Sequence, residues 1–472
     1  MTLLSGCANK EKFQEGPDGF NQDVGMIASP AGWTGNLPED EPRLPDRTDL
    51  CLAWERGVNL WAEEAARREN FDESKVRKYT LPPLPDTREE WEKQRPAILQ
   101  QFKDCIYGEM PPPPDRLELK LLSERNDALN GLALRREYRV YCKMNNGRSF
   151  DFDLMLYVPK TVKKPPVFVY LCGGNHYQSP EDDVRISRGA VSTKFSWHNL
   201  STSRQRGKGV DCYTLAVKRG YAVASAAFGE IFPDNLDGFR KSIFRLFYDD
   251  VRPDHEVALN EWKVNHRRRN FGGIGGWSWG NSRIVDALEK IGLTDPECVA
   301  VIGQSRLGKT SLWTGANDPR FKLVCVNNSG CCGAALARRN FGENMTQLWM
   351  VRSNWVCDRM VRYAGLEDEL PVDQHQLIAL VAPRAICVGS SSRDLNADPK
   401  GEFLATREAA KVWKFYGYRD LGVREMPPVN QVVGDRIRYF VKEGKHSLTL
   451  EDWGRYFDFA DELFGKKSSL PK

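Results

Sequence analysis

The segment that most constrains the fold is an apolar stretch followed by a glycine, a serine and a short turn into a helix. Residues 299–302 read Val-Ala-Val-Ile, and Gly303, Gln304 and Ser305 follow directly. A strand that ends at such a serine and continues into a helix is the layout of a nucleophile elbow, which lifts the serine oxygen clear of a sheet. The usual G-x-S-x-G pattern is broken here because Leu307 occupies the last glycine position. The segment therefore predicts a serine hydrolase.

A second interpretation of the same stretch is a phosphate-binding loop. The pattern G-x-x-x-x-G-K-[ST] is matched by Gly303, Gly308, Lys309 and Thr310. Such a loop also needs another apolar strand that ends in aspartate, which holds magnesium. The later apolar stretches end instead in Asn327-Asn328 and Ser390-Ser391. We therefore expect no bound nucleotide, and nucleotide binding stays the less supported alternative.

A serine hydrolase needs an acid and then a histidine downstream of its serine, and both are present. Asp394 lies five residues past the strand-like stretch 384–389, and His446 lies five residues past the stretch 437–441. A serine becomes nucleophilic when a histidine takes its proton and a carboxylate orients that histidine. We predict Ser305, His446 and Asp394 as the catalytic residues. Asp398, in the same loop as Asp394, is the alternative acid.

The negative oxygen that forms during acyl transfer needs hydrogen-bond donors that are already in place. The backbone N–H of Arg306 directly follows the nucleophile, and the loop Cys172-Gly173-Gly174 can supply a second donor. The Arg306 side chain is a cation at the start of a helix, where the helix dipole disfavours it. That placement suggests that Arg306 interacts with an anionic group.

Strands and helices alternate from about residue 130, which is typical of a mainly parallel sheet. We expect an antiparallel pair of strands at 132–142 and 150–158, followed by two short apolar strands at 166–171 and 221–226. A helix at 278–291 is expected to lead into the strand before Ser305. By this count Ser305 follows the fifth strand, Asn328 the sixth, Asp394 the seventh and His446 the eighth. The pattern predicts an α/β-hydrolase fold, a three-layer sandwich around a mainly parallel central sheet.

The chain of 472 residues is long enough for one large α/β domain with a leading segment. Residues 1–50 are rich in Gly, Pro, Asp and Asn, which is typical of an irregular tail. A helix is predicted at 88–106, before the four prolines at 111–114. We predict an N-terminal tail and wrapping segment at 1–75 and a catalytic domain at 76–472.

The first residues resemble a targeting signal. Leu4-Ser5-Gly6-Cys7 has the small-residue pattern that precedes a lipidated cysteine in bacterial lipoproteins, with a polar tail after it. A working signal would need residues upstream of Met1. We therefore expect a secreted protein, or a periplasmic or outer-membrane lipoprotein of a bacterium, in which residues 1–7 are a truncated signal and Cys7 carries a lipid anchor.

Composition excludes several other classes of protein. The net charge of +4 is close to balance and does not favour nucleic acid. The mean hydropathy is −0.54, and no stretch approaches the ~20 apolar residues of a membrane span. Cys325 and Cys387 lie in apolar strand candidates and are expected to be small buried hydrophobic residues. No C-x-x-C motif or histidine at zinc spacing is present, so we expect neither metal nor cofactor. A monomer is expected.

Several stretches of this sequence resemble those of a known family. The elbow 303–309 is similar to the G-x-S-R-x-G-K elbow of glucuronoyl esterases, carbohydrate esterase family 15. The likeness to bacterial members covers about residues 76 to 465. It includes the stretches 276–280, 317–321, 329–330, 333–335, 338–343, 382–384, 398–403, 446–449 and 452–453. The resemblance also explains the missing glycine of the elbow.

The resemblance implies roles for individual residues. Ser305 and His446 match the nucleophile and the base, and Arg306 matches an arginine that stabilises the oxyanion. Lys309 and Glu343 match residues that hold the hydroxyls of a glucuronic acid ring. The implied reaction is hydrolysis of the ester between 4-O-methyl-glucuronic acid of glucuronoxylan and a lignin alcohol, through a glucuronoyl-enzyme intermediate.

Three departures from the family pattern concern the acid and the substrate contacts. The family's usual acid follows the sixth strand, where this chain has Asn328; some bacterial members carry it after the seventh strand, which fits Asp394. A tryptophan often found two residues after that aspartate is Asn396 here. The loop 172–176 ends in Gly-Asn-His without the arginine that precedes it elsewhere. We predict Asn396 and His176 as substrate contacts, and an esterase for another uronate or an acetylated sugar is the alternative activity.

Overall fold

The structure is a computed structural model that describes residues 71–173, 179–181, 183–185, 188, 211–247 and 270–465. Two of the residues singled out above, Cys7 and His176, lie outside the described residues. The lipid anchor, the location outside the cytoplasm, the monomeric state and the boundary at residue 75 stay predictions.

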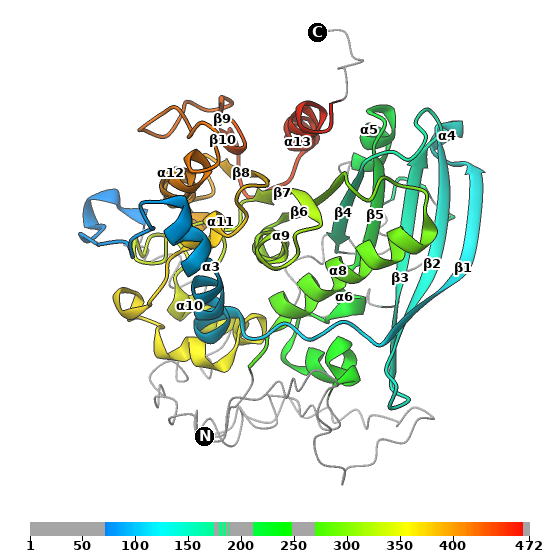
Figure 1. Ribbon diagram of the computed structural model, residues 1–472, viewed down its shortest axis with the longest axis horizontal. Helices are drawn as coiled ribbons and strands as arrows, with labels where there is room; N and C mark the ends of the chain where they lie inside the picture. Colours follow the sequence, from blue (N-terminus) through cyan, green and yellow to red (C-terminus); the bar gives the residue numbers. More distant parts are fainter. Residues whose placement is uncertain are drawn as a thin grey trace, which may run out of the picture.

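The core of the described structure is one mixed sheet of ten strands in the order β1-β2-β3-β5-β4-β6-β7-β8-β10-β9 (Figure 1). The neighbours from β5 to β10 in this order pair in parallel, and the pairs at the two ends are antiparallel. The strands are β1 Arg116–Asp127, β2 Ala133–Lys143, β3 Ser149–Pro159, β4 Val167–Cys172, β5 Ala222–Ala227, β6 Val299–Gln304, β7 Phe321–Asn327, β8 Ala385–Ser391, β9 Val432–Gly434 and β10 Ile437–Lys442.

The predicted strands are confirmed, but the strand count is wrong. Strands β1 and β9 were not predicted, so Ser305 follows the sixth strand of the structure, and His446 follows the tenth. Strand β1 is an edge strand, and none of its residues is buried. Its first residues do alternate, with Leu117, Leu119 and Leu121 between charged residues, so the strand was missed although the sequence carries the pattern. Strand β9 has only three residues and gives no pattern at all.

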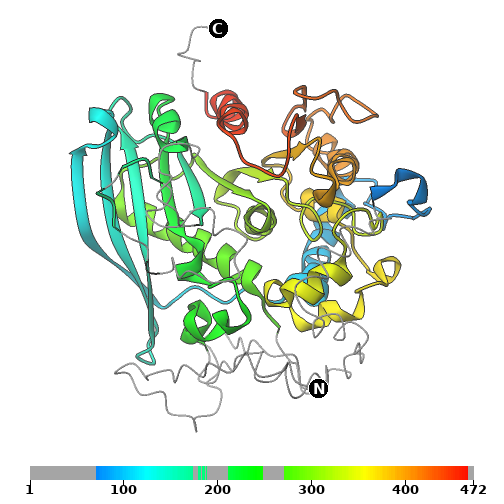
Figure 2. The same ribbon diagram turned by 180° about the vertical axis from the view of Figure 1, so that it is seen from behind.

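Helices cover both faces of the sheet, which makes the predicted three-layer sandwich. The two faces belong to two separate hydrophobic clusters: in β4, Val167 and Val169 point into one cluster, and Phe168 points into the other. This alternation follows from the two-residue period of a strand. Helices α8, α9 and α12 pack on the first face, and α5 and α13 lie together on the second. Helix α9 is seen end-on near the centre, from the front and from behind (Figures 1 and 2).

The helix before the serine strand begins earlier than predicted. Helix α8 spans Gly273–Ile291, whereas the sequence indicated a start at residue 278. Glycines in its first turns lower the helix propensity of that stretch. Packing explains one glycine further along: a Cβ on Gly280 would lie 2.5 Å from the Cδ1 atom of Ile231. The other α-helices are α3 Arg88–Phe102, α4 Ala128–Gly131, α5 Cys212–Lys218, α6 Phe228–Ile231, α9 Arg306–Asn317, α10 Met345–Arg352, α11 Gln374–Ala379, α12 Pro399–Lys414 and α13 Leu450–Leu463.

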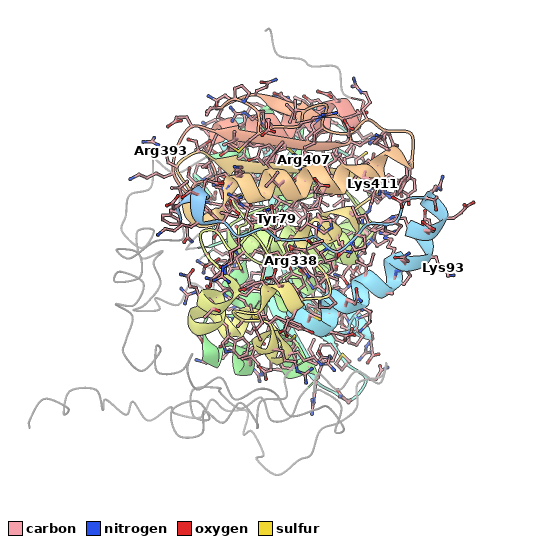
Figure 3. The ribbon with its side chains drawn as sticks, turned by 90° about the vertical axis from the view of Figure 1, so that its left-hand side faces the viewer. Tyr79, Lys93, Arg338, Arg393, Arg407 and Lys411 are labelled. Carbon is pink, nitrogen blue, oxygen red and sulfur yellow. The ribbon has the colours of Figure 1, made fainter. Side chains whose placement is uncertain are left out.

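The chain before α3 lies against the outer side of the domain. Glu73 forms ion pairs with Arg339 and Lys400, and the Pro82 carbonyl lies 2.9 Å from Nε2 of His375. Figure 3 shows Tyr79 beside Arg338, below helix α12. A surface cavity of about 870 Å³ opens there, and its lining includes none of the predicted catalytic residues.

The part of the chain that the structure describes contains neither a membrane-spanning helix nor a metal-binding group of side chains. No helix there is long and apolar enough to cross a bilayer. No group of three or more His, Cys, Asp or Glu side chains in the same residues is arranged to hold a metal ion.

Candidate active site

The turn at Ser305 has the backbone strain of a nucleophile elbow. Ser305 adopts φ 59° and ψ −126°, a conformation that residues with a side chain rarely adopt. Its N–H donates to the Asn327 carbonyl at 2.9 Å, and its carbonyl accepts from Lys309 N–H at 3.0 Å. The neighbouring strand and the first turn of α9 therefore hold the serine in this conformation.

Two glycines make this tight turn sterically feasible. A Cβ on Gly303 would lie 2.1 Å from the Leu307 carbonyl oxygen, and a Cβ on Gly308 would lie 2.9 Å from the Asn327 carbonyl oxygen. Gly308 stands one position later than the last glycine of G-x-S-x-G. The glycines that match the phosphate-loop pattern are therefore required by the packing of α9 against β6 and β7.

The other two residues of the phosphate-loop pattern have partners inside the protein. The Lys309 ammonium group donates to the Ser329 carbonyl at 2.5 Å and lies 3.4 Å from Glu343 Oε2. The Thr310 hydroxyl donates to the Arg306 carbonyl at 2.9 Å. Both side chains are buried. The match to the nucleotide-binding pattern thus has a structural explanation in which no phosphate takes part.

His446 and Asp394 form a hydrogen-bonded pair at the edge of the sheet where Ser305 lies. Nδ1 of His446 is 2.6 Å from Oδ2 of Asp394. The carboxylate is buried, whereas 43% of the histidine side chain is exposed. Strands β6, β8 and β10 are parallel members of one sheet, so the loops that follow them lie at the same edge. A buried carboxylate that orients an exposed imidazole is the arrangement that a triad requires.

The alternative acid has a different structural environment. The Asp398 carboxylate pairs with the guanidinium group of Arg339 and accepts from Gly401 N–H at 2.9 Å, as the N-cap of helix α12. Burial raises the pKa of Asp398 to about 6, although Arg339 and the Gly401 N–H oppose that rise. The structure therefore brings Asp394 to His446 and assigns Asp398 a capping role.

Asn328, which follows β7, joins the end of β8 to the loop that carries His446. Its side-chain amide donates to the Ser391 hydroxyl at 3.0 Å and to the Ser447 carbonyl at 3.1 Å. The same Ser447 carbonyl accepts from the Lys442 ammonium group at 2.7 Å. Two donors thus hold the residue next to His446, and Asn328 links that loop to the end of β8.

Arg306, directly after the serine, has an anionic partner that the sequence alone did not identify. Its guanidinium group is hydrogen-bonded to the Asp234 carboxylate. The guanidinium carbon lies 5.3 Å from the centre of the Trp355 ring and 5.8 Å from the centre of the Phe228 ring. Two sources of backbone donors were predicted for the oxyanion. Arg306 is described, and of the loop Cys172-Gly173-Gly174 the first two residues are described, whereas Gly174 is not.

Three of the four residues predicted to bind the substrate are described, and they lie near Arg306. Trp355 lies next to the Lys309 ammonium group, 5.8 Å from ring centre to nitrogen. The Glu343 N–H donates to the Asn396 carbonyl at 2.9 Å, so the two segments are adjacent. Lys309, Glu343 and Asn396 therefore share one region, next to the elbow. Asp234 and Trp355 were not predicted, because neither belongs to a motif or a periodic pattern in the sequence.

A second buried carboxylate, that of Glu402, lies beneath the same edge of the sheet. It accepts hydrogen bonds from the N–H and hydroxyl of Ser329, the N–H of Gly330 and the hydroxyl of Ser390, at 2.6–2.9 Å. Complete burial and the charge of Asp394 together raise the pKa of Glu402 to about 7, although hydrogen bonds from Ser390, Gly330 and Ser329 oppose the rise.

This carboxyl group should make the stability of the protein depend on pH. Its folded pKa of about 7 exceeds the ordinary value of 4.5, so the folded state keeps a proton that the unfolded state releases between these values. The free energy of unfolding should therefore fall by up to about 3 kcal/mol between pH 4.5 and 7.5. In the variant Glu402→Gln this contribution is absent, so its free energy of unfolding should fall by about 3 kcal/mol less than that of the wild type over the same interval. Urea unfolding of both proteins at several pH values measures the difference.

The control for this prediction is Glu89→Gln, which changes an exposed glutamate in the first turn of α3. This variant should keep the wild-type dependence of the unfolding free energy on pH. An unchanged pH dependence in Glu402→Gln would contradict the prediction.

Comparisons with known proteins show the family to which the chain belongs. The family model for glucuronyl esterases of fungi matches residues 258–417. Carbohydrate esterase MZ0003, from an unknown prokaryotic organism, is 35% identical over 428 residues, which are 86% of this chain and 94% of the relative. A 4-O-methyl-glucuronoyl methylesterase of Podospora anserina is 38% identical over 130 residues, which are 25% of this chain and 26% of that protein.

A solved structure is similar over most of the chain. The glucuronoyl esterase from Solibacter usitatus superposes with a TM-score of 0.72 at 32% identity, and the match covers 82% of this chain and 99% of that one. The fold is thus that of an α/β hydrolase, and the protein is a carboxylic ester hydrolase. The chain belongs to the glucuronoyl esterases, carbohydrate esterase family 15.

Proposed function

We propose that this esterase cleaves the ester between 4-O-methyl-glucuronic acid of glucuronoxylan and a lignin alcohol, with Ser305, His446 and Asp394 as its catalytic triad. The observation that carries the proposal is the 2.6 Å contact between His446 and the buried Asp394, at the sheet edge that also holds the strained Ser305. The family membership supports a uronate ester of a carbohydrate as the substrate.

In the proposed reaction His446 takes the proton of the Ser305 hydroxyl while the serine oxygen attacks the ester carbonyl carbon. Asp394 holds the imidazole through Nδ1, which leaves Nε2 to accept the proton. Arg306 faces the negative oxygen that develops in the tetrahedral intermediate. The alcohol leaves with the proton from His446, and a glucuronoyl ester on Ser305 remains. Water that His446 activates then hydrolyses this ester and releases the acid and the free serine.

We propose the region around Lys309 and Glu343 as the site for the sugar ring. The two charged groups lie 3.4 Å apart. The exposed fraction of the side chain is 3% for Lys309 and 12% for Glu343, and the Trp355 ring lies beside the ammonium group. Hydroxyls of a sugar can donate to the carboxylate and accept from the ammonium group. Such charge-assisted hydrogen bonds are stronger than neutral ones. Neither residue takes part in proton transfer in this proposal.

Lys309→Met and Glu343→Gln should weaken turnover of glucuronate esters selectively. Each variant removes a charge but keeps the side-chain volume. The loss of one charge-assisted hydrogen bond, worth about 1.5–3 kcal/mol, should lower kcat/KM for benzyl glucuronate by about 10- to 150-fold. Activity on a small aryl acetate, which has no sugar hydroxyls, should change much less. Equal losses on both substrates would mean that the two residues serve the structure.

A second candidate activity is hydrolysis of another uronate ester or of an acetylated sugar. The presence of Asn396, where relatives often carry a tryptophan, favours this candidate. The comparison of benzyl glucuronate with methyl galacturonate and aryl acetates distinguishes the two. A kcat/KM that is highest for benzyl glucuronate supports the proposal, and a higher value for methyl galacturonate or an acetate favours the alternative.

A further inference from the structure

The guanidinium group of Arg306 is enclosed by side chains from three other segments. Asp234, in the loop after α6, pairs with its Nη1 atom. The rings of Phe228 and Trp355 lie 5.8 and 5.3 Å from the guanidinium carbon. Only 12% of the Arg306 side chain and 11% of the Asp234 side chain are exposed. The cation is therefore held in one place rather than free in solvent.

Asp234 is itself held by further contacts. Its Oδ1 atom accepts from the indole N–H of Trp355 at 2.6 Å and from the Asn354 amide at 3.3 Å, while its Oδ2 atom faces Arg306. Burial disfavours the ionised form, but the charges of Arg306 and Arg352 outweigh it and hold the pKa of Asp234 below its ordinary value. The carboxylate is therefore charged at neutral pH, and it connects the arginine to the tryptophan.

A fixed cation stabilises a developing charge better than a mobile one. An arginine side chain loses up to about 2 kcal/mol of rotamer freedom when it becomes ordered. Electrostatic catalysis is most effective when this cost is met during folding rather than at the moment of reaction. A carboxylate at one end of the guanidinium plane and two rings beside it provide that order in the free enzyme.

We propose that Asp234 is a positioning residue for the reaction: it fixes the Arg306 guanidinium beside Ser305 and, through the indole N–H, fixes Trp355 next to Lys309. This inference rests on the proposed function, in which Arg306 stabilises the oxyanion. Asp234 does not touch the reacting atoms and acts only through its two partners.

The carboxylate also has an opposing effect, because its negative charge weakens the field of the cation. Asp234→Asn separates the two effects. The amide still has an oxygen for the Trp355 N–H, but it then presents an N–H donor to the guanidinium group, so Arg306 loses its acceptor. If orientation dominates, kcat falls. If the field dominates, kcat rises, and that result would overturn the proposal.

The test compares four full-length proteins: the wild type, Asp234→Asn, Arg306→Ala and the double variant. For each, kcat and KM are measured with benzyl glucuronate, and kcat is normalised to the concentration of active enzyme, determined by titration of the serine. Arg306→Ala should lower kcat by about 10²- to 10³-fold, as the loss of an oxyanion donor does. Asp234→Asn should lower kcat by roughly 10- to 100-fold and change KM by less than about threefold. In the Arg306→Ala background, Asp234→Asn should change kcat by less than about twofold.

A matched control is Asp318→Asn. Asp318 is also buried and also pairs with an arginine, at 3.0 and 2.7 Å from Nε and Nη2 of Arg320. It follows the last residue of α9, whereas Arg306 begins that helix, so the two positions are about 18 Å apart along the helix. Asp318→Asn should leave kcat unchanged after normalisation to active enzyme.

The possible results separate the two hypotheses. An effect of Asp234→Asn that is equally large with and without Arg306 would show a merely structural role and overturn the inference. A wild-type kcat in Asp234→Asn beside a low kcat in Arg306→Ala would overturn the inference alone. A wild-type kcat in Arg306→Ala would instead overturn the assigned role of Arg306 in the proposed function, and this inference with it.

Discussion

Replacing Ser305 with alanine should lower kcat for benzyl glucuronate by about 10⁶-fold, as the removal of the nucleophile does in other triad hydrolases. The alanine has no oxygen to attack the ester, and no neighbouring hydroxyl occupies the same strained turn. The fold should persist, because the Ser305 backbone makes the contacts that hold the elbow: its N–H bonds to Asn327 and its carbonyl to Lys309. The measurement is steady-state turnover together with urea unfolding of both proteins.

Ser305→Gly is the matched comparison. Both variants lack the hydroxyl, so both should be inactive. Glycine adopts φ 59° without steric cost, whereas alanine keeps the strain of the serine, and such strain is worth about 1–3 kcal/mol. Ser305→Gly should therefore be more stable than Ser305→Ala by about 1 kcal/mol. Turnover within tenfold of the wild type in either variant would contradict the assignment of Ser305 as the nucleophile.

Asp394→Asn should lower kcat by about 10⁴-fold, the loss seen when the acid of another serine triad becomes an amide. The carboxylate lies 2.6 Å from Nδ1 of His446, so it fixes the tautomer that leaves Nε2 free to accept a proton. An asparagine can place an N–H donor opposite Nδ1 and favour the wrong tautomer. It also removes the negative charge that stabilises the imidazolium ion formed during attack.

Asp398→Asn provides the control in the same loop. This change weakens the contact with Arg339 and the N-cap of α12, so it should lower the unfolding free energy and leave most of the activity. A larger loss of kcat in Asp398→Asn than in Asp394→Asn would reverse the assignment of the acid.

Asn328→Asp should restore part of the activity of Asp394→Asn, because it supplies a carboxylate after β7. The rescue should be incomplete for a structural reason. The Asn328 amide donates to the Ser447 carbonyl, and a carboxylate at this position would place one oxygen against another. The loop that carries His446 would then lose one of the two donors that hold it.

Local patterns in the sequence were sufficient for most of the fold. The apolar runs that became β4, β6, β7, β8 and β10 were recognisable because both faces of these strands are buried. The edge strand β1 was missed although Leu117, Leu119 and Leu121 alternate with charged residues at its start. The start of α8 was also missed, because Gly273, Gly275 and Gly276 lower the helix propensity of its first turn; packing requires a small residue at Gly273, where a Cβ would lie 2.7 Å from the Phe232 ring.

Some features of the candidate site could be predicted from the sequence, and others are visible only in the tertiary structure. The chain alone determined the elbow at Ser305, the order of serine, acid and histidine, and the resemblance to glucuronoyl esterases, because these depend on residues that are close in the sequence or on a family motif. Only the tertiary structure decided that Asp394, rather than Asp398, meets His446, and that Asn328 donates to the histidine loop. It also supplied Asp234, which is 72 residues from Arg306 and 121 from Trp355. Such contacts depend on which loops meet at the edge of the sheet, and that is set by strand order and packing, which no local pattern encodes.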